Sequence, residues 1–303
     1  MRIVYAGNFE RGITCLEALH NHGQDELTVI APPLSEIDSK RGSVVTYAQS
    51  QGICVLQPEN INSPRFISEL RQLQPDLLIL VGYRQILKKA ILAVPRLGCI
   101  NLHGGRLPDY RGVAPMNWMI INGESKGAVS IIFVDEGIDT GDIIAEANFD
   151  IDENDTIQDV VEKTCVLFPP LLITVVDSIR NGTVKRKKQN RNAGSYFTRR
   201  YPRDGFIDWK NVDAVQVHNL VRALTAPYPG AFTYYKEKKL FIWKTSLLSK
   251  SIRGIAGRVC LNHPRGVIVL ARDRGLVVES VQEIGKPVVP AATFFTQMGV
   301  DLR

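Results

Sequence analysis

The chain is poor in the features that would place it outside the ordinary globular class. Its 303 residues include five scattered cysteines and no CxxC pair, which argues against a structural zinc site and favours reduced cysteines in a cytoplasmic protein. No apolar run approaches the ~20 residues of a membrane helix, and the first residues lack a signal peptide's apolar core and cleavage motif. With 45% hydrophobic and 22% charged residues, the composition predicts a sizeable core and excludes disordered and fibrous classes.

Charge is distributed unevenly along the chain. Residues 1–184 carry 15 Lys and Arg against 23 Asp and Glu, whereas residues 185–303 carry 22 against 8. The asymmetry predicts two modules, the second meeting an anionic partner or simply presenting a solvated basic surface. The polar stretch 185–203 has no acidic residue, and its composition is typical of a surface linker. We therefore expect a domain of residues 1–184, a linker of residues 185–203 and a smaller domain of residues 204–303.

Short apolar runs alternate with helical patterns through the first part of the chain, which predicts βαβ units and a mostly parallel, Rossmann-like sheet. Strands are expected at 2–7, 27–32, 53–58, 76–83, 97–103 and 127–137, with helices between them and a long helix over 156–180. The last part combines one helix near 213–224 with a hairpin and regularly spaced short strands. This pattern predicts a small β-barrel, similar to an OB fold.

Two polar residues, Asn101 and His103, close one of the apolar strands and lie on the same face of it. A later loop after another strand carries four carboxylates, Asp135, Glu136, Asp139 and Asp142. Ligands of such sheets bind beyond the carboxyl ends of the strands. Singly, each residue also fits a structural role such as a turn former or loop cap. Together, a carboxylate, a histidine and an amide without a Ser or Cys nucleophile favour direct acyl transfer to an amine.

The motifs around these residues resemble those of the 10-formyltetrahydrofolate-dependent formyltransferases. The resemblance is carried by N-x-H at 101–103, LPxYRG at 107–112 and D-x-G-x-D-T-G-D at 135–142. It implies that His103 acts as base toward the amine or shuttles its proton, and that Asn101 stabilises the tetrahedral oxyanion. Asp139 would hold His103 and increase its basicity, and no metal would be needed.

The resemblance also implies where the formyl donor, 10-formyltetrahydrofolate, binds. In the family, backbone groups of two loop stretches hold the pterin edge. The implied donor-site residues are Gln85, Ile86, Leu87, Arg106, Leu107, Pro108, Asp135, Glu136, Gly137, Ile138 and Asp142. Three positions beside the folate depart from the family pattern, since Gly105 and Arg106 replace a serine and an apolar residue and Val113 replaces an arginine.

Three kinds of relative differ in the acceptor they formylate. Glycinamide ribonucleotide formyltransferases are nearer one domain long and have a glycine-rich phosphate loop, which AGNFERG at 6–12 lacks. Methionyl-tRNA formyltransferases have the right length and a basic second domain suited to phosphates, but their basic loop corresponds to a short, roughly neutral stretch at 32–44. Sugar-nucleotide N-formyltransferases, above all those acting on UDP-4-amino-4-deoxy-L-arabinose, are similar over nearly the whole chain, including 195–209 and 217–232.

We therefore expect formyl transfer to a nucleotide-linked 4-amino sugar, in lipopolysaccharide or O-antigen biosynthesis, with methionyl-tRNA as the alternative acceptor. Nucleic acid is a partner only in that alternative, membrane insertion is not expected, and self-association into a homo-oligomer is left open. A degenerate fold used only for binding is the non-enzymatic hypothesis, which the intact catalytic set disfavours. The candidate acceptor contacts are Arg111, Arg199, Arg200, Arg222 and Tyr228.

Overall fold

A computed structural model describes residues 1–33 and 43–303, which form two compact units. Unit 1 comprises residues 1–115, 127–149 and 161–197, and unit 2 comprises residues 116–126, 150–160 and 198–303. The division is therefore not sequential, because two stretches within the expected first domain of residues 1–184 belong with the C-terminal residues. The stretch expected as a linker also differs: residues up to 197 belong to unit 1, since Lys187 bridges to Ile143.

Unit 1 is built on a seven-stranded sheet, in the order β3-β2-β1-β4-β5-β7-β8. The first five strands are parallel and β7 runs antiparallel to β5, which confirms the expected α/β class with a mostly parallel sheet. The strands are β1 (Arg2–Gly7), β2 (Glu26–Ile30), β3 (Cys54–Leu56), β4 (Leu77–Val81), β5 (Cys99–His103), β7 (Lys126–Phe133) and β8 (Ile143–Asp150). A separate two-residue strand, β6 (Arg111–Gly112), pairs with β9 (Tyr196–Phe197).

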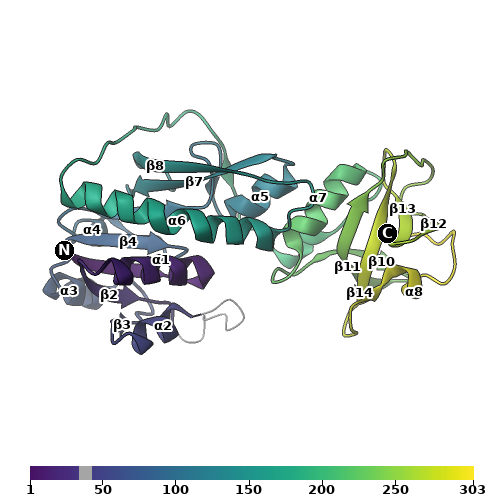
Figure 1. Ribbon diagram of the computed structural model, residues 1–303. Helices are drawn as coiled ribbons and strands as arrows, with labels where there is room; N and C mark the ends of the chain where they lie inside the picture. Colours follow the sequence, from purple (N-terminus) through teal and green to yellow (C-terminus); the bar gives the residue numbers. More distant parts are fainter. Residues whose placement is uncertain (34–42) are drawn as a thin grey trace. The chain divides into compact units, whose positions relative to one another are not determined.

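Alternating residues of the parallel strands supply two cores, one on each face of the sheet. Ile3 and Tyr5 of β1 pack under α1 (Phe9–His22) and α6 (Ile157–Arg180), which cover one face (Figure 1). Val4 and Ala6 pack on the other face, where α3 and α4 supply apolar side chains. The remaining helices of this unit are α2 (Val44–Ser50), α3 (Pro64–Gln72) and α4 (Lys89–Leu92). Helix α3 is capped by Ser63, whose hydroxyl accepts a hydrogen bond from the Phe66 amide.

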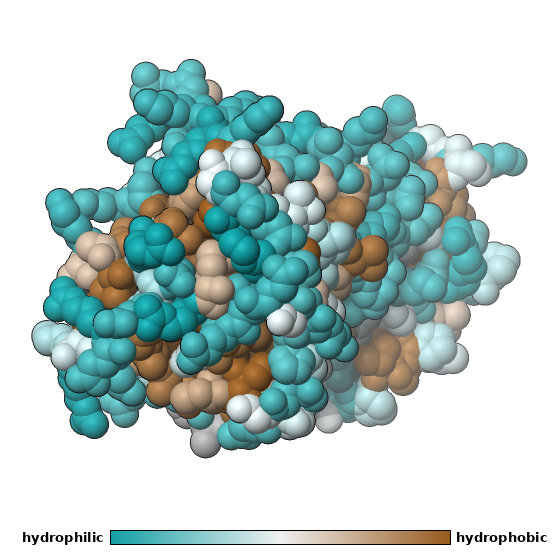
Figure 2. Space-filling view, turned by 60° about the vertical axis from the view of Figure 1, so that its left-hand side comes forward, coloured by the Kyte–Doolittle hydropathy of each residue, from teal (hydrophilic) through white to brown (hydrophobic). Residues whose placement is uncertain are grey.

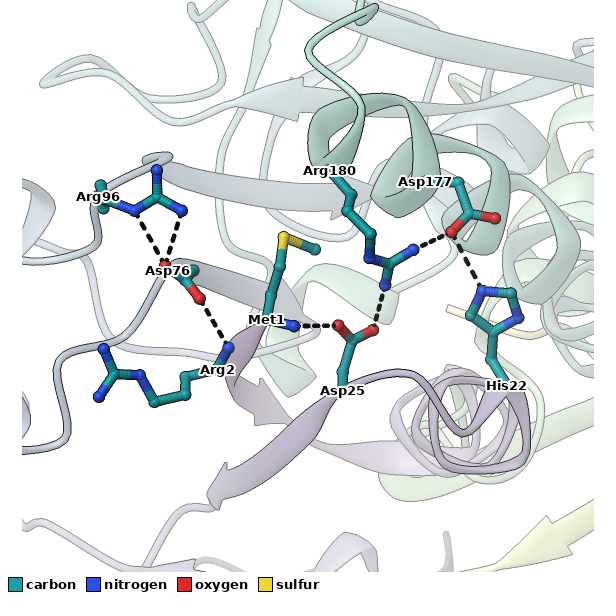
Figure 3. Close-up of polar contacts among 8 residues, drawn as sticks. All are labelled: Met1, Arg2, His22, Asp25, Asp76, Arg96, Asp177 and Arg180. Atoms are coloured by element: carbon teal, nitrogen blue, oxygen red, sulfur yellow. Dashed lines mark hydrogen bonds and ion pairs between the residues drawn. The ribbon is translucent and has the colours of Figure 1, made fainter.

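Ion pairs tie together the edge of the sheet at which the parallel strands begin (Figure 3). The buried carboxylate of Asp25 accepts from the Met1 amino group at 2.9 Å and from Arg180 at 2.6 Å. Arg180 also pairs with Asp177, which lies 3.1 Å from the His22 ring. These contacts fix the end of α6 against the start of β2. They lie at the edge opposite the carboxyl ends of the strands, and so leave that end for a site.

Unit 2, expected to be a small β-barrel similar to an OB fold, is dominated by an antiparallel sheet in the order β10-β11-β14-β13-β12, with β15 paired to β14, which confirms a second, β-rich domain. Trp209 lies in the core of this unit, and Trp243 is stacked on Phe241. The strands are β10 (Ala231–Tyr235), β11 (Lys238–Leu247), β12 (Val259–His263), β13 (Gly266–Leu270), β14 (Gly275–Glu283) and β15 (Val289–Pro290). The helices are α5 (Pro115–Ile121), the 3-10 turn η3 (Pro202–Gly205), α7 (Ala214–Leu224) and α8 (Ala291–Phe294).

The surface seen in Figure 2 is mostly hydrophilic, with separate apolar patches between polar side chains. Within residues 1–33 and 43–303, no helix is long and apolar enough to cross a membrane. Over the same residues, no group of three or more His, Cys, Asp or Glu side chains is placed to hold a metal ion. All five cysteines are free thiols, and burial raises the pKa of Cys15 and Cys99 to about 12.

Candidate active site

The three residues expected to carry the chemistry come together at the carboxyl end of β5. Asn101 Nδ2 donates to Asp139 Oδ1 at 3.4 Å, and His103 Nδ1 lies 3.6 Å from the same oxygen. The other oxygen, Asp139 Oδ2, accepts from the Gly112 amide at 2.9 Å. His103 is 5% exposed and Asp139 is partly exposed, so the carboxylate is the more accessible member of the pair.

Both ring nitrogens of His103 face acceptors. Nδ1 faces Asp139, and Nε2 lies 2.6 Å from the Tyr110 carbonyl oxygen. A neutral imidazole has one N–H, so only the doubly protonated ring donates to both acceptors. Gly105 allows this close packing, because a Cβ there would lie 3.1 Å from His103 Nε2 and 2.7 Å from Pro115 Cβ. The departure from serine at this position thus has a local steric reason.

The loop that carries Asp139 is shaped by its own polar groups. Asp135 Oδ1 accepts from the Gly137 amide at 3.0 Å and from Thr140 Oγ1 at 2.6 Å, while Asp135 Oδ2 pairs with Arg191 at 3.1 Å. Asp139 has φ of +53°, in the left-handed region that non-glycine residues seldom adopt. The loop therefore holds its catalytic candidate in a conformation that needs support from neighbouring contacts.

An exposed ion pair links the neighbourhoods of the two stretches implied at the donor site, since Lys89 Nζ, two residues after the first stretch, is 3.3 Å from Glu136 Oε1 in the second. Ile86 and Ile138 are 70% and 53% exposed, so each stretch presents an apolar side chain that could pack on a ring. The polar side chain of Gln85 already has partners within the protein, because it accepts from the Ile61 amide and donates to the Glu59 carbonyl oxygen. This fits recognition through backbone groups, which was the expectation for the pterin.

Other implied donor-site residues have structural contacts of their own. Leu107 is buried against Ile132 and Ile143, and Leu87 belongs to the core on the α3 face of the sheet. Arg106 Nη2 donates to Asn148 Oδ1 at 3.3 Å, so its guanidinium is held along β8. Val113, in the position of a family arginine, is 48% exposed. Pro108 lies with Arg106 and Leu107 in the turn after β5, and Gly137 and Asp142 lie in the loop that carries Asp139.

Comparisons with known proteins identify the family of this chain. The formyl transferase family model matches residues 1–176, and the model of the formyl transferase C-terminal domain matches residues 200–299. The chain belongs to the formyl transferase family. The expected enzyme class is thereby confirmed, and 10-formyltetrahydrofolate is the formyl donor typical of this family.

Individual relatives differ in acceptor. A methionyl-tRNA formyltransferase of Ruminiclostridium cellulolyticum is 36% identical over 292 residues, which are 93% of this formyltransferase and 92% of the relative. Among solved structures, a sugar 3N-formyl transferase, WlaRD, matches with a TM-score of 0.70 at 23% identity, covering 95% of this chain and 99% of that one. A methionyl-tRNA formyltransferase from Clostridium thermocellum matches with a TM-score of 0.61 at 20% identity, covering 82% and 94%. The two structural likenesses show the fold.

Two of the arginines expected to contact the acceptor are structural in this formyltransferase. Arg111 is fully buried, and its guanidinium donates to Gln189 Oε1 and to the carbonyl oxygens of Asn190 and Ala193. Arg222 is 6% exposed and donates within unit 2 to backbone and side-chain oxygens. The expectation that these two arginines meet the acceptor is therefore corrected, since their donors are used inside the protein.

The remaining acceptor candidates lie in unit 2 with more open surroundings. Arg199 is exposed. Arg200 is half-buried with its guanidinium 5.4 Å from the Trp118 ring, and its buried Nε has no acceptor among the described residues. Burial lowers the pKa of Arg200, an effect that nearby Tyr228 and Asp204 oppose. A half-desolvated cation with an unused donor is suited to an anionic ligand.

A cavity of about 410 Å³ lies in unit 1 beside the loop that carries Asp139. Its wall combines loop residues with three cationic side chains from the basic stretch, and Arg186 lies 3.7 Å from the Phe133 ring centroid. The lining residues are Phe133, Val134, Asp135, Thr140, Gly141, Asp142, Arg186, Lys188, Gln189 and Arg191. Gln189 was not predicted from the sequence as a lining residue, because it interrupts the basic run as an ordinary polar residue and belongs to no motif.

Proposed function

We propose that this formyltransferase transfers the formyl group of 10-formyltetrahydrofolate to the amine of methionyl-tRNA. The supporting observation is the 36% identity to a methionyl-tRNA formyltransferase over 92% of that relative's length, which includes both domains. This proposal takes the acceptor that the sequence analysis held as its alternative. The sugar-nucleotide acceptor, which the sequence analysis favoured, becomes the second candidate.

In the proposed reaction the uncharged amine of the acceptor attacks the formyl carbon. A carbon–nitrogen bond forms, and the carbonyl oxygen becomes a tetrahedral oxyanion to which the amide of Asn101 donates. The amine gives up one proton to the His103–Asp139 pair as this bond forms. The bond from the formyl carbon to the tetrahydrofolate nitrogen then breaks, and the same proton passes to that leaving nitrogen.

The contacts of His103 refine its proposed role. Because Nε2 lies 2.6 Å from the Tyr110 carbonyl oxygen, accepting a proton at Nε2 would require that hydrogen bond to be broken. Asp139 is the more exposed partner, at 14% against 6% for the two side chains. In our proposal Asp139 therefore receives the amine proton, and His103, whose Nδ1 lies 3.6 Å from Asp139 Oδ1, acts as a polar neighbour that positions this carboxylate.

A tRNA acceptor also fits the charge of the exposed surface. Segment 185–199 carries a series of exposed cationic side chains that could neutralise phosphates, namely Lys185, Arg186, Lys187, Lys188, Arg191 and Arg199. Each phosphate contact releases counterions, so the KM for tRNA should rise steeply between 50 and 200 mM salt. The KM for a nucleotide-linked sugar, which has only two phosphates, should change little over the same range.

We further propose that Arg200 contacts an anionic group of the acceptor. Its unused Nε and the adjacent Trp118 ring provide a donor beside a flat apolar surface. Arg200→Met should raise the KM for the acceptor by ~10-fold and leave the KM for the donor unchanged, because one charge-assisted contact is lost. Arg253→Met, which removes an exposed arginine of unit 2 outside the proposed contacts, is the matched control and should change the acceptor KM by less than ~3-fold.

A sugar nucleotide is retained as a second candidate acceptor because of one sequence observation. The stretch 32–44, which corresponds to a basic loop of the tRNA enzymes, has Lys40 and Arg41 balanced by Glu36 and Asp38. Residues 34–42 lie outside the part of the chain that the structure describes.

The two candidates are separated by measuring tetrahydrofolate release with each acceptor in parallel. One set of reactions contains methionyl initiator tRNA, and the other contains UDP- and dTDP-linked 4-amino sugars, each with 10-formyltetrahydrofolate. The proposal expects release with the tRNA and only background release with the sugars. Release with a sugar nucleotide alone would replace the proposed acceptor by the second candidate.

A further inference from the structure

We propose that Gln189 is a positioning residue for the formyl transfer, clamped by the buried Arg111, and that it holds the backbone on both sides of Asp139. This proposal deepens the proposed function and rests on it for the role of Asp139. It concerns two side chains that touch neither of the reacting groups in the scheme above.

Gln189 bridges two parts of unit 1 that are distant in sequence. Its Nε2 donates to the carbonyl oxygen of Asp139 at 2.9 Å and to that of Gly141 at 2.8 Å. Its Oε1 accepts from Arg111 Nη2 at 2.9 Å and from Arg111 Nε at 3.2 Å. One amide side chain thus connects the catalytic loop to a guanidinium with no exposure to solvent.

The hydrogen-bonding capacity of this amide is used up by those contacts. Both N–H groups of Gln189 Nε2 have a backbone acceptor, and both lone-pair directions of Oε1 have an arginine donor. Although Gln189 lines the cavity, it has no donor left for a ligand there. Its contribution is therefore to the shape of the loop, and a direct role in binding is not expected.

Asp139 is the residue in this loop that most needs such support. Its φ of +53° is a conformation that costs on the order of 1 kcal/mol or more in a non-glycine residue. The Gly112 amide, which bonds Asp139 Oδ2, directly follows Arg111. Arg111 and Gly112 form β6, which pairs with β9. One short strand thus holds the Asp139 carboxylate through Gly112 and the Asp139 backbone through Arg111 and Gln189.

Gln189→Glu tests this clamp with an isosteric change. The new carboxylate still accepts from Arg111, but it has no N–H to donate to the carbonyl oxygens of Asp139 and Gly141. Its negatively charged oxygen would instead repel these two carbonyl oxygens. We expect kcat to fall by ~10-fold or more, the KM for 10-formyltetrahydrofolate to stay within ~3-fold, and the thermal midpoint to change little. Gln57→Glu is the matched control, since Gln57 Nε2 also donates to a backbone carbonyl oxygen, that of Pro32, at 2.7 Å.

The rate of hydrogen exchange at the Gly112 amide tests the clamp without any substrate, because this amide donates to Asp139 Oδ2. With the loop released, the bond from Gly112 to Asp139 Oδ2 should open more often, and exchange should accelerate by ~10-fold in Gln189→Glu but not in Gln57→Glu. If Gln189→Glu does not fold, Gln189→Asn, which keeps the amide but shortens its reach, is expected to show the same faster exchange and lower kcat.

A double-mutant cycle with Asp139→Asn separates a positioning role from general destabilisation. Once Asp139→Asn has removed the carboxylate, adding Gln189→Glu should lower kcat by less than ~2-fold further, because the two changes share one function. Additive losses, or an unchanged Gly112 exchange rate in Gln189→Glu, would overturn the proposal. An active wild type with an inactive Asp139→Asn and a fully active Gln189→Glu would refute the clamp while leaving the proposed function intact.

Discussion

Replacing Arg111 by Met should release the segment 185–197 from the body of unit 1. The guanidinium is fully buried and makes four hydrogen bonds to this segment, at 2.9–3.2 Å. Methionine has a similar length and fills most of the same space, so the change removes donors more than volume. Gln189, Asn190 and Ala193 would then lose the side chain that holds them.

The size of the effect follows from two opposing contributions. Four lost hydrogen bonds at roughly 1 kcal/mol each give about 4 kcal/mol. Two contributions offset part of this: the charged guanidinium no longer has to be desolvated, and Asn190, which is exposed, regains water for its carbonyl oxygen. A net cost of about 2 kcal/mol remains. Because 1.36 kcal/mol corresponds to a tenfold change in an equilibrium constant, the opened form should become ~30-fold more populated.

Limited trypsin digestion of the full chain measures that population. Lys187, Lys188 and Arg191 are exposed trypsin sites inside the segment, and cleavage there requires local opening, so its rate follows the opened fraction. We expect cleavage within 185–197 to be ~30-fold faster in Arg111→Met than in wild type. Arg96→Met, in which an arginine with 70% of its side chain exposed is replaced, is the control. An unchanged cleavage rate in Arg111→Met would refute the assigned role of the buried guanidinium.

Three further predictions concern packing and pH. Gly105→Ala should destabilise unit 1 by about 1–3 kcal/mol in urea unfolding, because its Cβ would press on Pro115 and His103; an unchanged midpoint would contradict the packing. Burial lowers the pKa of His218, so unit 2 should lose stability as pH falls through ~6.5, seen by tryptophan fluorescence, and His218→Gln should remove that dependence. A hydrogen bond from the Arg2 backbone lowers the pKa of Asp76 below its ordinary value of 3.8, so Asp76→Asn should lower the thermal midpoint at pH 7, and the difference should shrink as the pH falls below that ordinary value.

The fold was predictable because its strands and helices carry strong local signals. The continuous apolar runs at β4 and β5 predicted strands of a mostly parallel sheet at these positions. The boundary between units was harder to place, because it depends on contacts that sequence order does not reveal. Residues 116–126 and 150–160 belong to unit 2, although they lie inside the stretch expected as one domain.

The catalytic candidates were predictable for a different reason. Asn101 and His103 share a strand face, so their proximity follows from the period of a strand, and the resemblance supplied Asp139. The roles of the arginines could not be predicted from the sequence in this way. Arg111 and Arg200 look alike as residues in basic motifs, yet one is fully buried and the other has an unused donor. Only the packing of distant segments decides which cation holds the protein together and which remains available to a ligand.

The most direct test of the central claim follows a labelled formyl group from 10-formyltetrahydrofolate to methionyl-tRNA in a single turnover, with wild type and with Asp139→Asn. We expect label on the methionyl amine with wild type, and transfer slowed by ~100-fold or more with Asp139→Asn at unchanged donor affinity. Transfer by Asp139→Asn within a few-fold of wild type would contradict the role assigned to this carboxylate. Absence of label on the tRNA with an active wild type would contradict the proposed acceptor.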